Sequence, residues 1–180
     1  MKFEYDIFIS SPPASGAESQ PSTEWAQKFS DFLSVLMERL YNRKPSIMLH
    51  DDLRIRQSMM GENARTLMGQ SAAAIIILSP EFARSPAYLR GRIEGTLTVL
   101  GQPLAGEEQP DFLKDGIHYN FYEINRYNKK AITYDLNAKN GPDSRFWSKL
   151  VDLAYDISGV LSVVSGVSKD TVPSAETPGV

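Results

Sequence analysis

The serines Ser10 and Ser11 are the first residues in the chain whose type and position suit ligand binding. They directly follow the segment YDIFI, which has the β-branched and aromatic residues of a strand. In open α/β sheets, ligands bind beyond the carboxyl ends of the strands, where serine hydroxyls and backbone amides could hold a ribose or a phosphate. A serine-proline turn also ends many strands for structural reasons alone. Both interpretations stay open at this point.

His50, Asp51 and Asp52 form a second group, with the residue types of a metal site. If a strand continues through them, alternation puts His50 and Asp52 on one face of the sheet and Asp51 on the other. One face then has two ligands, whereas a protein metal site normally needs at least three. We therefore expect no metal ion here.

Glu94 is the third candidate. It follows Ile93 in a segment that we predict to be helical, at the border of the buried stripe, where a carboxylate can be partly desolvated and point into a cleft. Arg90 precedes it by four residues, so a surface ion pair on the same helix face is the alternative interpretation. Spacing alone does not separate a catalytic glutamate from a surface one.

Several common catalytic and nucleotide-binding motifs are absent from the sequence. It contains no GxGxxG and no GxxxxGK[ST], so the phosphate-binding loops of nucleotide-binding proteins are missing. It contains no GxSxG, and its two histidines, His50 and His118, do not accompany a nucleophile elbow. The sequence therefore disfavours hydrolysis by a serine triad.

The elements that position these residues alternate between strands and helices. We predict strands at 5–10, 46–49, 72–78 and 130–136, and the uninterrupted apolar run AAAIIIL at 72–78 is typical of a central parallel strand buried on both faces. GIHYNFYEI could be a strand or a helix, so the fourth strand is left unplaced. Strand-helix units in series predict an α/β fold, a doubly wound, mostly parallel sheet with helices on both faces.

The predicted helices are marked by apolar residues at three- and four-residue spacing. We predict a short helix near 62–70 and three longer ones. Their apolar faces consist of Trp25, Phe29, Leu33, Leu36 and Leu40; of Leu89, Ile93, Leu97 and Leu100; and of Phe146, Leu150, Leu153 and Ile157.

Composition narrows the kind of protein. The 180 residues are 42% hydrophobic, enough for one domain with a core, which we place at 1–162, followed by a flexible tail or linker at 163–180. With a net charge of −3 and scattered basic residues, we expect no direct nucleic-acid binding. The sequence has no cysteine, no signal-peptide pattern and no apolar run long enough for a membrane span, so we expect a cytoplasmic protein without membrane contact.

In their order along the chain, YDIFIS, AAAIIILSPEF and FWSKL resemble the motifs of a bacterial Toll/interleukin-1 receptor (TIR) domain. The resemblance covers nearly the whole chain, to about residue 159. Each motif is short and degenerate, and the combination is more specific than any one of them. The resemblance implies a flavodoxin-like fold with a five-stranded sheet.

The resemblance also implies an activity. Many bacterial TIR domains cleave NAD+ between nicotinamide and ribose, with an essential glutamate on the helix after the third strand and no cofactor or metal. This implies Glu94 as the catalytic residue, with Ser10, Ser11, Asp52 and Leu53 beside the substrate. In the family, the loop that begins with Asp52 and Leu53 here must move to admit NAD+, and a neighbouring TIR domain often holds it open.

The sequence departs from the family in one respect. The family's glutamate commonly lies four residues after a tryptophan or another aromatic residue, but counting four from Tyr88 reaches Arg92, and counting four from Ala87 reaches Gly91. Either the turn before the helix carries about three extra residues and Glu94 is in register, or the catalytic acid is missing.

Two functions follow as expectations. One is an NAD+ glycohydrolase, activated by self-association with other TIR domains as a homo-oligomer or filament, in bacterial defence or signalling. The other is a non-enzymatic TIR adaptor. In either case the tail could connect to a sensor domain or a partner protein. A receiver domain of the same fold is disfavoured, because the acidic residues that it needs after strands one and three are replaced by serines.

Overall fold

The computed structural model describes residues 3–11, 23–51, 66–78, 96–104, 117–136 and 141–165. Its centre is a five-stranded, all-parallel sheet in the order β2-β1-β3-β4-β5. The strands are β1 (Tyr5–Ser11), β2 (Ile47–Asp51), β3 (Ser71–Leu78), β4 (Thr96–Leu100) and β5 (His118–Asn120). This is an α/β fold with the strand order of flavodoxin-like proteins, and it confirms the predicted fold class.

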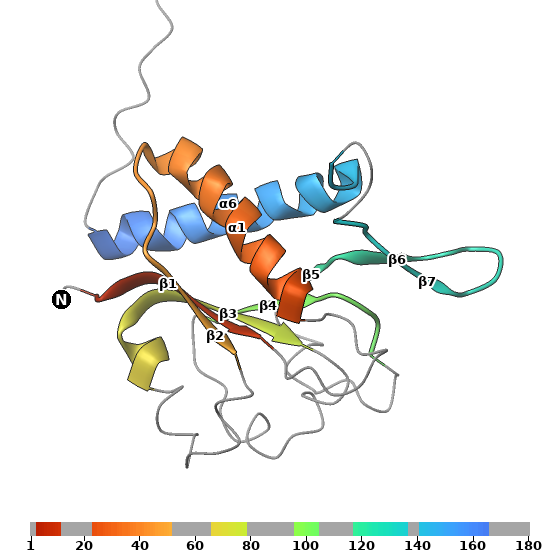
Figure 1. Ribbon diagram of the computed structural model, residues 1–180, viewed down its shortest axis with the longest axis horizontal. Helices are drawn as coiled ribbons and strands as arrows, with labels where there is room; N and C mark the ends of the chain where they lie inside the picture. Colours follow the sequence, from red (N-terminus) through yellow and green to blue (C-terminus); the bar gives the residue numbers. More distant parts are fainter. Residues whose placement is uncertain are drawn as a thin grey trace, which may run out of the picture.

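Two long helices cover one face of this sheet, α1 (Thr23–Tyr41) and α6 (Ser144–Ser165) (Figure 1). The short helical turn at 66–69 lies on the other side of the sheet, where Met68 packs against Ile76, Leu78 and Leu100. Helical segments thus lie on both faces, as the sequence predicted. Among the helices that the structure describes, none combines the length and apolar character of a membrane span.

The helix α1 forms where the sequence predicted it. Its fully buried side chains are Ala26, Phe29, Leu33 and Met37, and their spacing places one apolar stripe against the sheet. Glu24 in the first turn and Arg39 in the last turn suit the helix dipole. The helix ends before Asn42, whose φ of 54° is the left-handed conformation in which helices commonly terminate.

The helix α6 begins at a side-chain cap. An oxygen of the Asp143 carboxylate accepts a hydrogen bond from the backbone N–H of Arg145 at 2.9 Å, which satisfies one of the free donors at the helix start. The predicted apolar face, Phe146, Leu150, Leu153 and Ile157, is completely buried. The helix continues to Ser165, and residues 166–180, most of the predicted tail, lie outside the described ranges.

An aromatic cluster joins the two helices to the end of β5. The rings of Trp25 and Phe29 stack with centroids 5.2 Å apart, and Phe121 meets both Phe29, at 5.5 Å, and Phe146, at 5.1 Å. At the other end of α1, the Tyr41 hydroxyl donates a hydrogen bond to the Ser158 carbonyl at 2.5 Å. These contacts hold α1 and α6 together over the sheet.

The third predicted long helix is wrong in its second half. The apolar stripe was assigned through Leu97 and Leu100, but Thr96–Leu100 is the strand β4, paired in parallel with β3. This strand is the fourth of the sheet, which the sequence left unplaced. The segment GIHYNFYEI contains the fifth strand and β6 (Tyr122–Ile124).

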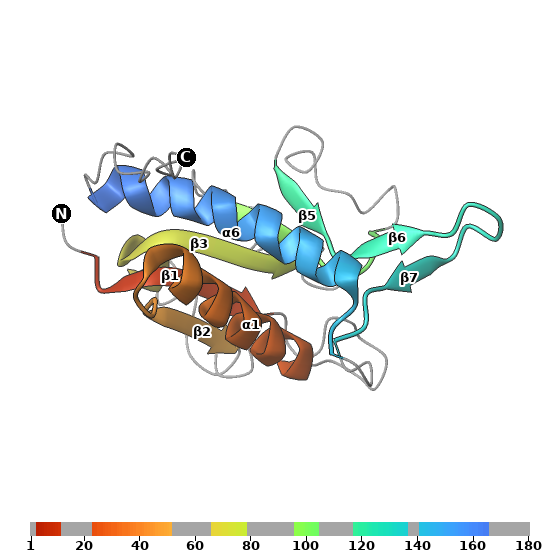
Figure 2. The ribbon, with the colours of Figure 1, turned by 90° about the horizontal axis from the view of Figure 1, so that it is seen from above.

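The last predicted strand, 130–136, is not part of the main sheet. Its core, β7 (Ala131–Thr133), pairs antiparallel with β6 in a separate two-stranded hairpin. The views in Figures 1 and 2 agree that this hairpin extends away from the sheet and beyond the ends of both helices.

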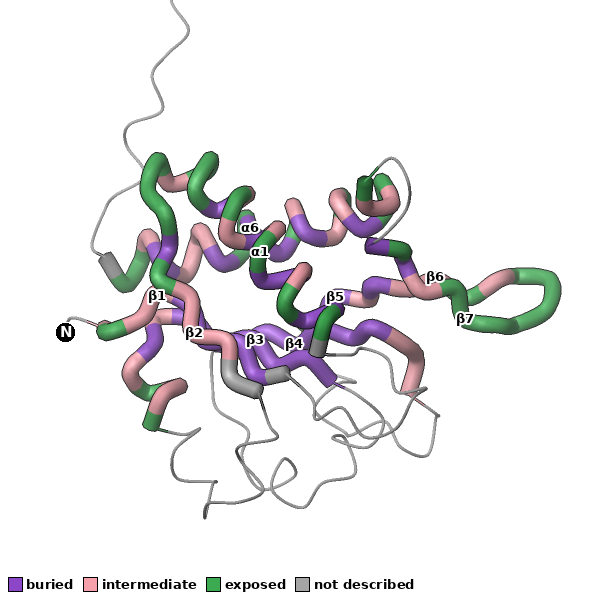
Figure 3. Tube along the Cα trace, in the orientation of Figure 1, coloured by how far each residue is buried: buried purple, intermediate pink, exposed green. Residues whose placement is uncertain are grey.

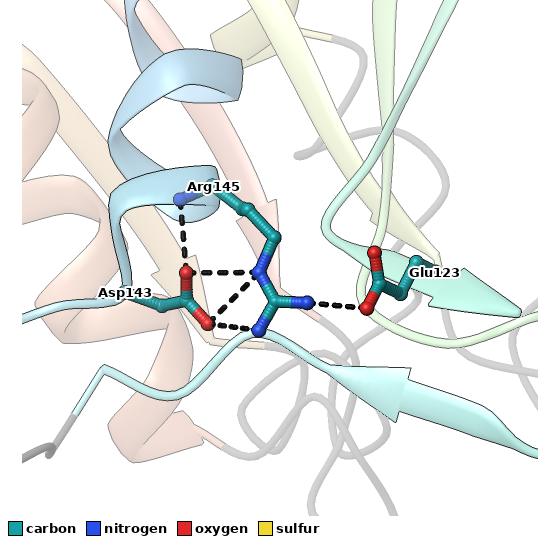
Figure 4. A network of polar contacts seen from close by, with 3 residues as sticks. All are labelled: Glu123, Asp143 and Arg145. Atoms are coloured by element: carbon teal, nitrogen blue, oxygen red, sulfur yellow. Dashed lines mark hydrogen bonds and ion pairs between the residues drawn. The ribbon is translucent and has the colours of Figure 1, made fainter. Parts of the chain in front are cut away.

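A polar network fixes the base of this hairpin to the start of α6 (Figure 4). The Arg145 guanidinium donates to the Glu123 carboxylate on β6 and to the Asp143 carboxylate, with Arg145 Nη2 and Asp143 Oδ2 2.5 Å apart. The same guanidinium lies over the ring of the buried Tyr134, 5.1 Å from its centroid. These hydrogen bonds lower the pKa of Asp143 below its ordinary range.

Candidate functional site

The order of the strands defines where a ligand is expected. The chain passes from β1 to β2 on one side and then crosses to β3 on the other side of β1. This reversal between β1 and β3 is the topological switch point, and ligands of open α/β sheets bind beyond the carboxyl ends of the strands there. Ser10 and Ser11 end β1 at this point, as the sequence predicted.

Ser10 lies on the face of the sheet opposite α1 and α6. Along β1 the side chains of Ile7 and Ile9 join the core under the helices, so alternation directs Phe8 and Ser10 to the other face. Ser10 is only 9% exposed, so the residue is largely buried. The Ser11 side chain is outside the described residues.

Ser10 belongs to a row of paired residues that starts at His50 on β2 and runs across all five strands. Ser10 pairs with Ile76 on β3, which pairs with Thr98 on β4, which pairs with His118 on β5. Neighbouring strands lie about 4.8 Å apart, which puts the Cα of Thr98 about 10 Å from that of Ser10. Ser10 and Thr98, which is 6% exposed, therefore offer two buried hydroxyls on one face, separated by the apolar Ile76.

Asn120 adds an amide group to the same face at the carboxyl end of β5, in register with Leu100. Its side-chain oxygen Oδ1 is buried and accepts no hydrogen bond from the residues that the structure describes. Leaving a buried acceptor unpaired costs about 1–3 kcal/mol, so such atoms in native proteins call for an explanation. An N–H or O–H group of a bound molecule is a partner that this oxygen could accept from.

Sequence reasoning did not find Thr98 or Asn120. Thr98 was hidden by the helix prediction over this segment, and Asn120 lies in GIHYNFYEI, which was not assigned to an element. The alternation in TLTVL was a signal for a strand, since Leu97 and Val99 face the helices while Thr98 and Leu100 face away from them.

Tyr122 packs on the same face of the sheet. Its ring packs against the small cluster of Ile76, Leu78 and Leu100. Burial raises the pKa of the Tyr122 hydroxyl above its ordinary value of 10.0, so the group stays protonated near neutral pH. It can donate a hydrogen bond, but it does not supply a base.

The other predicted site residues are not brought together by the described structure. Glu94, Asp52 and Leu53 all lie outside the described residues. Because Leu97 and Leu100 belong to a strand, the apolar stripe that placed Glu94 at a helix border no longer holds. Glu94 precedes β4 by two residues, and the start of β4 is at the end of the sheet opposite the carboxyl ends of β1 and β3. The catalytic role of Glu94 stays a prediction.

The structure describes only the backbone of His50 and Asp51 from the group of residues with metal-ligand chemistry. β2 runs through His50 and ends at Asp51, so the strand that the alternation argument assumed does exist that far. The side chains of both residues and all of Asp52 are outside the described part of the chain. Within the described ranges, no three His, Asp or Glu side chains are grouped closely enough to hold a metal ion.

Comparison with known proteins adds no family assignment. No protein-family model matches the chain, and no curated protein matches it significantly. The resemblance therefore rests on the sequence motifs alone. YDIFIS falls on β1, AAAIIIL on β3 and FWSKL on the first turns of α6. β1 and β3 are neighbouring strands of the sheet, and α6 covers one of its faces.

Proposed function

We propose that this chain is a TIR-type NAD+ glycohydrolase that cleaves the bond between nicotinamide and ribose. The observation that carries the proposal is the strand order, which puts Ser10 and Ser11 at the switch point between β1 and β3. The motif positions on β1, β3 and α6 support the same family. NAD+ is the substrate, and the reaction needs no cofactor and no metal.

The reaction breaks the bond between the nicotinamide nitrogen and the ribose anomeric carbon. Nicotinamide leaves with the bonding electron pair, and positive charge develops on the ribose as in an oxocarbenium ion. In the proposal, the Glu94 carboxylate stabilises this charge while water attacks the anomeric carbon and loses a proton to solvent. This role requires the segment that links β3 to β4 to bring Glu94 to the carboxyl ends of the strands, although β4 itself starts at the opposite end of the sheet. The products are nicotinamide and ADP-ribose.

The described face gives specific roles to the residues around the reaction. In the proposal, the Ser10 hydroxyl at the end of β1 binds a ribose hydroxyl or a phosphate oxygen, and Ser11, Asp52 and Leu53 complete the substrate side. An extended dinucleotide can span the roughly 14 Å from β1 to β5, three strand spacings. Asn120 Oδ1 is then an acceptor for the far part of the substrate.

The experiment that tests the proposal measures nicotinamide release from NAD+ by the purified chain, free in solution and clustered on a surface. Glu94→Gln keeps the size of the side chain but removes its charge, and we expect turnover to fall about a hundredfold, equivalent to about 3 kcal/mol of transition-state stabilisation. Arg90→Ala is the matched control and should have a much smaller effect, as for a surface ion pair.

Two outcomes would count against this assignment. A Glu94→Gln protein as active as the wild type would remove Glu94 from the site while leaving the enzyme in place. A wild type that releases no nicotinamide even when clustered would instead favour the adaptor function. The adaptor is the second candidate because the structure has a projecting, largely exposed hairpin, β6–β7, of a kind that suits protein contacts (Figure 3).

A further inference from the structure

The β6–β7 hairpin is an ordered arm on the surface of the domain. Its strands pair in antiparallel register, Glu123 with Ile132 and Ile124 with Ala131, and residues 126–132 are all exposed. The main sheet is complete without it, and it follows the fifth strand as an addition to the five-stranded fold. Tyr122 at its base packs against the domain, but the exposed residues 126–132 are not explained by packing.

The turn of the hairpin is held by a set of local hydrogen bonds. The Asn125 side chain accepts from the backbone N–H groups of Tyr127, at 2.9 Å, and Asn128, at 3.3 Å. The Asn125 backbone donates to the carbonyl of Lys130 at 2.8 Å and accepts from the N–H of Lys129 at 2.9 Å. Lys129 has a φ of 58°, which completes the reversal of the chain. The turn thus has one defined shape.

The base of the hairpin is fixed as well. Arg145 binds Glu123 on β6 and Asp143 at the start of α6, which links the base of the arm to the helix (Figure 4). A surface that is held in one conformation before binding loses less conformational entropy when a partner docks. The turn and the base of the hairpin are both held by hydrogen bonds, so the arm is suited to act as a contact surface.

The exposed side chains of the arm are apolar and basic. Tyr127 is 98% exposed, and Ile124 and Ile132 are 45% and 38% exposed. Residues 124–133 also contain three cations, Arg126, Lys129 and Lys130, and no acid. Since the whole chain has a net charge of −3, the remainder carries −6. The arm is a basic and aromatic tip on an acidic protein.

The outer side of α1 has the complementary chemistry. Its exposed residues at three- and four-residue spacing form one stripe, made of Glu24, Gln27, Asp31, Val35 and Glu38. Glu24 is paired with Lys28 at 2.7 Å, whereas neither Asp31 nor Glu38 forms an ion pair in the described part of the chain. Val35, 48% exposed, lies between these two carboxylates.

We propose that the β6–β7 hairpin of one copy docks on the outer face of α1 of a second copy. The cations of the arm meet Asp31 and Glu38, and the exposed apolar side chains of the arm meet Val35. The arm extends away from α1 of its own chain, so the contact forms between copies (Figure 2). The two surfaces differ, so copies pair reciprocally, close into a ring or continue as a filament. The contact does not depend on the proposed enzymatic activity.

Charge exchange on the full chain tests this contact by sedimentation velocity across a wide range of protein concentration. We expect the double variant Lys129→Glu/Lys130→Glu and the double variant Asp31→Lys/Glu38→Lys each to raise the concentration for half-association at least about tenfold. An equimolar mixture of the two variants restores association, because each altered surface then finds its altered complement. Tyr127→Ser weakens association without changing its salt dependence.

The matched control is Lys149→Glu, a charge reversal on α6, which contributes no residue to the hairpin or to the stripe on α1; the Lys149 side chain is 43% exposed and pairs with Asp152 at 3.6 Å. It should leave association unchanged. The proposal is overturned if the wild type sediments as a monomer at every concentration, or if the two double variants do not restore each other. It is also overturned if Lys129→Glu/Lys130→Glu, but not Asp31→Lys/Glu38→Lys, abolishes binding to phosphatidylserine vesicles or single-stranded DNA, which would make the arm a binder of anionic surfaces.

Discussion

The two faces of the central sheet are built for different purposes. The face under α1 and α6 is mostly apolar, and the Tyr119 hydroxyl on this side donates to Asp156 at its edge. The opposite face carries buried polar groups among its apolar ones, Ser10 and Thr98 in one row and Asn120 beyond them. The first face stabilises the fold. The second face is partly made of polar groups that can form hydrogen bonds with a ligand.

The largest expected effect comes from the helical face. Phe29→Ala removes a completely buried ring that stacks on Trp25 and meets Phe121. We expect the free energy of unfolding to fall by about 3–5 kcal/mol, measured by urea denaturation. Phe32→Ala is the control, since Phe32 is only partly buried at the rim of the same cluster. If both variants lost the same stability, the helical face would not have the central role described above.

Two adjacent residues on β1 separate stability from substrate binding, because their side chains lie on opposite faces of the sheet. Ile9→Ala on the helical face should cost about 2–5 kcal/mol of stability. Ser10→Ala on the opposite face should cost within about 1 kcal/mol and should raise the KM for NAD+. Thermal unfolding and nicotinamide release measured on both variants separate the two roles. A Ser10→Ala protein with unchanged KM would remove that hydroxyl from the site.

The smallest effect concerns the contact between the hairpin and α6, which belongs to neither face. Asp143→Asn keeps the cap of α6 but removes the charge that binds Arg145, and we expect a loss of about 0.5–1 kcal/mol at neutral pH. The pKa of Asp143 is lowered in the folded state by its hydrogen bonds with Arg145. Its contribution is therefore fully present above the ordinary pKa of 3.8 and is lost as the pH falls through the lower folded value.

The stability curves of the wild type and Asp143→Asn should therefore converge in acid, as followed by urea denaturation at a series of pH values. A difference between them that stays constant down to strongly acidic pH would mean that the charge of Asp143 does not stabilise the fold.

Much of the fold follows from local sequence patterns. The apolar run at 72–78 is long and continuous enough to identify the central strand, and the apolar spacing around Phe29 and Phe146 identifies both long helices. The sequence predicts a helix over Thr96–Leu100 because Leu97 and Leu100 continue the helical spacing of Leu89 and Ile93, and the strand-like alternation of TLTVL covers only five residues. The partner of β7 could not be predicted, since strand pairing depends on contacts outside the segment.

Some residues of the candidate site can be predicted from local sequence patterns, and others cannot. Ser10 and Ser11 were identified because the end of an evident strand is a local feature. Thr98 and Asn120 join Ser10 on one face only through the register of four strands, and no local pattern contains that register. Glu94 was chosen as an isolated acid in an apolar segment, and its role depends on the experiment above.

The position of β1 inside the sheet has a consequence for synthesis. Both of its neighbours, β2 and β3, come later in the chain, so within this sheet β1 has no strand partner until 40 more residues, to Asp51, have followed. At about 5–20 residues per second this takes roughly 2–8 s. During that time Ile7, Phe8 and Ile9, all completely buried in the finished domain, are without their partners. Within this sheet, YDIFIS is therefore an apolar segment that waits for its pairing strands during synthesis.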